Sequence, residues 1–183
     1  MRPRRALHAH ITLHQSHPHN KTVHPAVLKA MRITASSADI KKFVIDNNRI
    51  EGILRKSSLA ELKEFQRFLA LDKITVEELE SFVSVYAPDA KLRDTAGLNV
   101  RVGNHQPPPG GPNILIDLEE LLDDEDLSPY EQHIAYETLH PFTDGNGRSG
   151  RALWAWRMRE FPLGFLHHFY YQTLATTRPP NAT

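Results

Sequence analysis

The sequence of 183 residues contains no cysteine. Disulfide bridges, thiolate nucleophiles and cysteine-ligated metals are therefore excluded, and the composition fits a reducing compartment. No apolar stretch approaches the ~18 residues that a membrane-spanning helix requires. No apolar segment follows the basic start MRPRRALHAH, so a secretory signal is not expected. These absences predict a cytoplasmic protein without a membrane partner.

An excess of charge of either sign is also missing, because 22 Lys and Arg residues balance 22 Asp and Glu residues. This balance gives no support to bulk binding of nucleic acid, so no nucleic-acid partner is expected. The length predicts one domain with at most a small appendage. A chain of this size can bury a sizeable core without disulfides or structural metals.

Residues 1–30 differ from the rest of the chain because they hold six of its eleven histidines and show no sustained apolar period. Two H-x-H spacings leave a metal-binding tract as an alternative, but no carboxylate or cysteine completes such a site. We expect a disordered, His-rich tail. Met31 offers an alternative start for the natural chain. The histidines of the tail are His8, His10, His14, His17, His19 and His24.

From about Ser36 the chain has the apolar periodicity of helices. Three segments begin with the Ser/Thr-x-x-Glu pattern of a capping box, in which two side chains satisfy the free backbone N–H groups of a helix start. These pairs are Ser58 with Glu61, Thr75 with Glu78, and Ser128 with Glu131. The segments NILIDLEELLDDED, SGRALWAWRMREF and GFLHHFYYQTLA predict further helices, so the expected fold class is mainly α.

Residues 91–112 interrupt this helical pattern with glycines and prolines. Short apolar alternation between two glycines is a weak signal for a β-hairpin. The residues of this predicted hairpin are Val100, Arg101, Val102 and Gly103. The prolines that follow predict an irregular loop.

The stretch LHPFTDGNGRSGRALW, residues 139–154, contains the spacing G-x-G-x-x-G. A dinucleotide-binding loop requires a strand before that spacing and an acidic residue ~20 positions later. Here a capped helix precedes it, and no acidic residue follows Phe161. A kinase glycine loop would place valine where Ala152 stands, and the lysine of a Walker A loop is absent. The stretch is therefore predicted to be a helix–loop–helix.

The residue types of this loop suit the binding of phosphates. Loop N–H groups and a helix N-terminus together form an anion-binding nest. Arg148 and Arg151 lie three residues apart and share a helix face, where they can neutralise two phosphate groups. Asp144 among them suggests a Mg²⁺ ion between its carboxylate and the phosphates. His140 can act as a general base at neutral pH, which completes a nucleoside triphosphate site.

Residues 140–151, HPFTDGNGRSGR, resemble the Fic-domain signature H-x-F-x-[DE]-G-N-G-R-x-x-R at every defined position. The wider resemblance covers about residues 36–175 and implies a Fic-fold helical bundle with a short β-hairpin flap. Most Fic proteins are adenylyltransferases, which move AMP from ATP to a protein hydroxyl. ATP and Mg²⁺ are therefore the expected substrate and cofactor, and the expected protein partner is a target with an exposed Tyr, Ser or Thr hydroxyl.

The resemblance also implies a role for each signature residue. His140 removes the proton from the target hydroxyl, and Asp144 holds Mg²⁺. Phe142 packs inward, and the predicted hairpin at 100–103 is the flap that registers the target segment beside the nucleotide. The remaining signature residues bind the phosphates, and they are Gly145, Asn146, Gly147, Arg148 and Arg151.

Residues 47–52, NNRIEG, resemble the inhibitory-helix motif [ST]-x-x-x-E-[GN] of many Fic proteins. In that subgroup the glutamate pairs with the second signature arginine and blocks the productive pose of the γ-phosphate. The resemblance implies that Glu51 inhibits the enzyme through Arg151. Asn47 departs from the motif, because it stands where Ser or Thr is usual, although Asn can still form side-chain hydrogen bonds.

The expected organisation is a tail over residues 1–30, an inhibitory helix region over 31–55, a Fic core over 56–175 and a flexible tail over 176–183. Other Fic-type reactions stay open: transfer of UMP, phosphocholine or phosphate, and removal of AMP with Glu51 positioning water. A Doc-like kinase would have A-N-K-R in place of G-N-G-R. The non-enzymatic alternative is a regulatory module that retains nucleotide. The target can be a second copy of the chain, and a homo-oligomer is also possible.

Overall fold

A computed structural model describes residues 35–158 of the chain. The predicted tails at both ends, the region around Met31 and the helix expected at 164–175 lie outside the described residues. Within the described range the helices are α2 (Ser37–Ile50), α3 (Leu59–Leu69), α4 (Val76–Tyr86), α5 (Pro112–Asp123), α6 (Pro129–Leu139) and α7 (Asn146–Met158). The mainly helical fold class is thus confirmed. None of these helices is long and apolar enough to cross a membrane.

Capping residues explain where several helices begin. Capping boxes form at the starts of α2, α3 and α6, with the N-cap residues Ser36, Ser58 and Ser128. At the start of α4 the Thr75 hydroxyl accepts a hydrogen bond from the backbone N–H of Glu78 at 3.4 Å. The Glu78 carboxylate, however, pairs with Arg67 of α3. The box predicted at Thr75 is therefore only half formed, because an ion pair with a neighbouring helix engages its second member.

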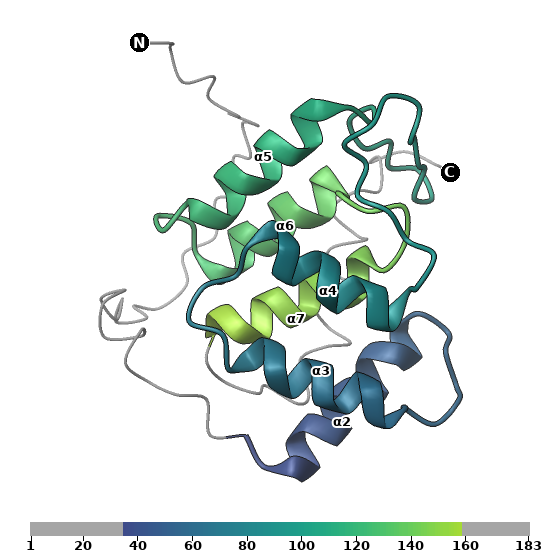
Figure 1. Cartoon of the computed structure of the whole chain (residues 1–183), viewed down its shortest axis with the longest axis vertical. Helices are drawn as coiled ribbons and strands as arrows, with labels where there is room; N and C mark the ends of the chain where they lie inside the picture. The colour runs from purple at the N-terminus through teal and green to yellow at the C-terminus, as the bar shows by residue number, and fades with distance from the viewer. Residues whose placement is uncertain (1–34, 159–183) are drawn as a thin grey trace, which may run out of the picture.

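Helix α7 lies in the middle of the bundle, where it packs against α2, α3, α4 and α6 (Figure 1). Its residues 152–155, ALWA, are all buried. The rings of Phe43 on α2 and Phe65 on α3 stack with their centroids 4.3 Å apart. Burial of each large apolar side chain contributes about 1.5–3 kcal/mol. This core holds the first turn of α7 against the end of α2, and both carry predicted site residues.

The long connection from α4 to α5 contains the flap segment, which we define as residues 97–108. The described residues include no named strand, so the predicted β-hairpin is not seen. One isolated antiparallel bridge joins Val102 to His105 instead, with N···O distances of 3.0 and 2.9 Å. A left-handed Gly103 (φ 57°) makes the turn tight. Three prolines at 107–109 carry no N–H group and cannot extend a ladder beyond this bridge.

Candidate active site

The predicted base, His140, lies at the sharp turn between α6 and α7. Helix α6 ends at Leu139, and His140 follows in the left-handed conformation with φ 51° and ψ 61°. Its backbone N–H donates to the Tyr136 carbonyl at 2.9 Å. Positive φ is uncommon for residues other than glycine, although histidine adopts it more readily than most.

The pKa of His140 is lowered to about 4, first of all because the imidazole is buried. Electrostatic interactions with Arg93 and His105 lower it further, while a backbone hydrogen bond with Glu137 and the charge of Glu51 oppose them. The ring is therefore neutral at pH 7 and able to accept a proton. Negative phosphates bound nearby would raise its pKa again and make it a stronger base.

Helix α7 begins at Asn146, three residues before the segment SGRALWAWRMREF that predicted it. Gly145 in the left-handed region (φ 79°) turns the chain, and Ser149 N–H then donates to the Gly145 carbonyl at 3.0 Å. A Cβ at Gly145 would lie 3.3 Å from the Cβ of Ala87, so the turn also packs closely against α4. The signature residues Asn146, Gly147 and Arg148 consequently form the first turn of α7, where backbone N–H groups have no partner within a helix.

Asn146 holds the signature loop in shape. Its Oδ1 accepts from the Phe142 backbone N–H at 2.8 Å, and its Nδ2 donates to the Phe142 carbonyl at 2.7 Å. Both residues are buried, which confirms the inward packing of Phe142. A direct contact between Asn146 and phosphate stays a prediction, because both ends of its amide are engaged with the loop.

Arg148 is 4% exposed and faces the loop from the first turn of α7. Its Nη1 donates to the Tyr86 carbonyl at 2.5 Å, and its Nη2 lies 3.7 Å from Asp144 Oδ1. Its buried Nε has no hydrogen-bond partner in the described structure. A buried guanidinium with an unsatisfied donor is a favourable partner for an anion.

Asp144 has the properties of a ligand for Mg²⁺ bound to phosphates. Its side chain is 71% exposed, and its Oδ1 accepts from Gly145 N–H at 2.6 Å. Among the described residues no group of three His, Cys, Asp or Glu side chains gathers into a metal site. Mg²⁺ commonly uses one or two carboxylates together with substrate phosphates and waters, so a single exposed aspartate fits that mode of binding.

Arg151, on the next turn of α7, is 2% exposed and contacts the end of α2. It forms an ion pair with Glu51, the residue that follows α2. Its Nε also donates to Asn47 Oδ1 at 2.5 Å, while Asn47 Nδ2 donates to the Arg148 carbonyl at 3.1 Å. A Cβ at Gly147 would overlap the end of the Glu51 side chain, so the carboxylate would have to shift if a larger residue stood there.

Two residues near His140 were missed by sequence reasoning. Arg93 is fully buried and donates to the His140 carbonyl at 2.6 Å. Nothing in its sequence neighbourhood signals this role. Glu137, one turn before His140 on α6, could have been found from its i−3 spacing. Burial raises the pKa of Glu137 to about 7, with the charge of Glu51 adding to the effect and that of Arg151 opposing it.

His133 lies on α6, seven residues before His140, and is 3% exposed. Its Nε2 lies 3.9 Å from Glu137 Oε1. Burial lowers the pKa of His133 to about 3, so the ring is neutral at pH 7. His133 is therefore a buried, neutral residue of α6 next to Glu137.

The flap segment lies against the end of α6. His105 Nε2 donates to the Thr138 carbonyl at 2.9 Å. Because a carbonyl oxygen can only accept, the Nε2 atom of His105 carries a proton in this contact. Among the predicted flap residues, Arg101 is exposed and donates through Nε to the Gly103 carbonyl at 3.1 Å. The flap segment is therefore next to His140, although the predicted contact with a target remains untested.

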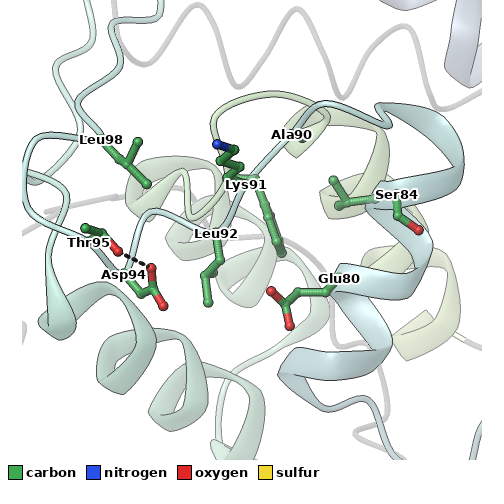
Figure 2. A pocket seen from close by; sticks show the side chains of 10 residues that line it. Glu80, Ser84, Ala90, Lys91, Leu92, Asp94, Thr95 and Leu98 are labelled. Atoms are coloured by element: carbon green, nitrogen blue, oxygen red, sulfur yellow. Dashed lines mark hydrogen bonds between the residues drawn. The ribbon is translucent and has the colours of Figure 1, made fainter.

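A surface pocket of about 410 Å³ opens between α4 and residues 90–98 (Figure 2). Glu80 of α4 and Asp94 lie on its two sides, with Leu92 between them, and Asp94 accepts a hydrogen bond from Thr95 at 3.0 Å. Phe142 is the signature residue that lines it. Since His140 and the two signature arginines do not line this pocket, it is separate from the candidate phosphate site.

A family model described as the Fic/DOC family matches residues 58–157, which is more than half of the chain. The sequence of the chain matches no curated protein and no solved structure. Fic domains transfer a nucleotide or a similar group onto proteins. The match spans α3 to α7 and includes the whole signature loop, while Glu51 and α2 lie before it. With this match and a complete signature at the α6–α7 turn, the chain belongs to the Fic/DOC family.

Proposed function

We propose that this protein is an adenylyltransferase that moves AMP from ATP to a Tyr, Ser or Thr hydroxyl of a target protein, and that Glu51 inhibits it. The observation that carries the proposal is the arrangement at the α6–α7 turn. A neutral, partly buried His140 follows the end of α6, and two buried arginines occupy the first turns of α7. This arrangement supplies a base for a hydroxyl and positive charge for a leaving group.

The reaction is an exchange at the α-phosphorus of ATP. His140 accepts the proton of the target hydroxyl, and the hydroxyl oxygen forms a bond to the α-phosphorus. The bond from that phosphorus to the oxygen bridging the α- and β-phosphates breaks, and pyrophosphate leaves. Arg148 and Arg151 stabilise the negative charge of the leaving group. Mg²⁺ held by Asp144, when bound, neutralises phosphate charge and orients the nucleotide.

The inhibition follows from competition for Arg151. A carboxylate and a γ-phosphate bind a guanidinium with the same charge-assisted hydrogen bonds. The Glu51 carboxylate already accepts such a bond from Arg151 Nη2, and the Nε of the same guanidinium donates to Asn47 Oδ1. A γ-phosphate must therefore displace Glu51 before Arg151 can bind it.

The test uses Mg²⁺ and ATP labelled at the α-phosphate, with a parallel reaction labelled at the γ-phosphate. Four proteins are compared: wild type, Glu51→Gly, Glu51→Gly with His140→Ala, and Asp46→Asn. Asp46 is the matched control because its carboxylate lies on α2, five residues before Glu51, but pairs with exposed Arg49, at 3.6 Å. Purified protein and cell lysate serve in turn as acceptors.

The proposal predicts protein-bound α-label that increases at least about tenfold in Glu51→Gly, as expected when a charge-assisted bond no longer competes. The label should disappear with His140→Ala, and Asp46→Asn should behave as wild type. Bound γ-label without α-label would establish kinase chemistry instead. An unchanged rate in folded Glu51→Gly would reject the inhibitory role of Glu51.

A further inference from the structure

The last carbonyl groups of α6 are bound by side chains of the flap segment and the residues leading into it. The final carbonyls of any helix lack partners within the helix and must find them elsewhere. Thr138 O accepts from His105 at 2.9 Å. Leu139 O and His140 O accept from Arg93 Nη1, at 3.2 and 2.6 Å. The helix that carries the base thus ends against the flap rather than against solvent.

Arg93 joins this helix end to both ends of the flap segment. Its Nε donates to the Leu98 carbonyl at 2.8 Å, and its Nη2 donates to the Pro108 carbonyl. The Arg93 backbone N–H donates to the Pro141 carbonyl at 2.8 Å, directly after His140. One fully buried guanidinium therefore contacts the start of the flap segment, its end, and the base-bearing turn.

The acceptors of Arg93 are main-chain carbonyls, and no carboxylate is among its hydrogen-bond partners in the described structure. Burial of an unpaired charge is costly, and the planar guanidinium offsets that cost through several fixed N–H donors. A lysine would retain the charge but not the planar arrangement of donors. The position thus requires the geometry of arginine as well as its charge.

We propose that Arg93 and His105 are positioning residues that couple the flap segment to His140, so that a target segment seated on the flap and the base that deprotonates it share one rigid frame. This inference rests on the proposed function for its kinetic part alone. A displaced flap would move three carbonyls at the end of α6, and His140 with them. Conversely, ordering of the flap by a target would hold the imidazole in place.

The test compares Arg93→Lys, Arg93→Met and His105→Ala, each with and without Glu51→Gly. Arg157→Lys is the matched control, because Arg157 also binds three main-chain carbonyls, those of Asp124, Glu125 and Leu127 at 3.0–3.3 Å. These carbonyls belong to the α5–α6 connection rather than to the flap. The first readout is amide hydrogen exchange of residues 97–108, and the second is the NMR titration of the His140 ring. Neither readout depends on catalysis.

Arg93→Lys and His105→Ala should each speed exchange across the flap segment by at least about tenfold, as expected when hydrogen bonds that close a segment are lost. Arg93→Met should also raise the pKa of His140, because the positive charge of Arg93 lowers that pKa in the wild type. The other groups that face the imidazole are His105, Glu51 and the Glu137 backbone. Arg157→Lys should change neither readout.

In the Glu51→Gly background, Arg93→Lys and His105→Ala should each lower kcat for the target at least about tenfold. The Kd of a non-hydrolysable ATP analogue should stay within about twofold, because neither residue contacts the proposed phosphate site. Unchanged flap exchange in folded Arg93→Lys and His105→Ala would overturn the coupling, as would an unchanged His140 titration in folded Arg93→Met. If Glu51→Gly itself transfers nothing, the proposed function fails, while exchange and titration still decide the coupling. His105→Ala removes no buried charge and keeps the test valid if Arg93→Met does not fold.

Discussion

Asn47 joins helix α2 to the first turns of helix α7 through both ends of its side-chain amide. It is 1% exposed, accepts from Arg151 Nε at 2.5 Å and donates to the Arg148 carbonyl at 3.1 Å. Asn47→Ala removes both hydrogen bonds and leaves a charged N–H group of Arg151 without this acceptor. We expect this substitution to loosen the contact through which Glu51 reaches the candidate site.

The magnitude follows from the two lost interactions. A hydrogen bond to a charged group contributes about 1.5–3 kcal/mol, and a neutral one about 0.5–1.5 kcal/mol. The free energy of unfolding should therefore fall by about 2–4 kcal/mol. With a denaturant slope of about 2 kcal/mol per molar urea, the unfolding midpoint should move down by roughly 1–2 M. The fluorescence of buried Trp154 on α7 provides the signal.

Asn48→Ala is the matched control for this experiment. Asn48 is equally buried and donates to Glu61 Oε1 at 3.1 Å, but that partner lies on α3. Both variants should lose stability, whereas only Asn47→Ala should speed amide hydrogen exchange in the first turn of α7. A loss below about 0.5 kcal/mol for Asn47→Ala, or equal exchange in the two variants, would refute the proposed link between α2 and α7.

Three further outcomes are expected. Glu137→Gln should stabilise the protein increasingly as pH rises from about 4.5 to about 7 and then level off. The pKa of the Glu137 carboxyl is raised to about 7 in the folded protein, so its ionisation destabilises the wild type as pH rises from about 4.5 to about 7. The resulting loss in the free energy of unfolding of the wild type should be about 1–3 kcal/mol, measured by urea titration at each pH. Gly147→Ala should change the free energy of unfolding by about 1 kcal/mol or less, because the added methyl meets the end of the flexible Glu51 side chain, which can move aside. Tyr136→Phe should lower the free energy of unfolding by about 1 kcal/mol, through loss of the buried 2.7 Å hydrogen bond to Ser149.

The helix starts were predictable because a cap depends on residues within one turn. Ser58 and Ser128 form their capping boxes with residues three positions later, as the local pattern indicates. Thr75 shows the limit of this reasoning, because Arg67 on another helix engages its expected partner, Glu78. A local pattern cannot show which distant charge will lie near a carboxylate.

The flap illustrates the same limit for strands. Alternation over residues 97–103 predicted a hairpin, but the flap segment has only one isolated bridge in the described structure, between Val102 and His105. A strand needs a partner segment with free N–H groups, and the prolines at 107–109 cannot provide them. The neighbour of this segment is instead the end of α6, reached through His105 and Arg93.

The sequence by itself determined the family, the helical class and the set of signature residues, because residues 140–151 are contiguous and each has a recognisable chemistry. Tertiary structure decided which charges meet. Glu51 and Arg151 lie 100 positions apart and pair because α2 packs against α7. Asn47 departs from the expected motif, yet it hydrogen-bonds to both Arg148 and Arg151 in the first two turns of α7. Arg93 could not be recognised beforehand, since its acceptors are main-chain carbonyls that any sequence would provide. Only the folding of the flap and the α6–α7 turn around its guanidinium gives that arginine a role.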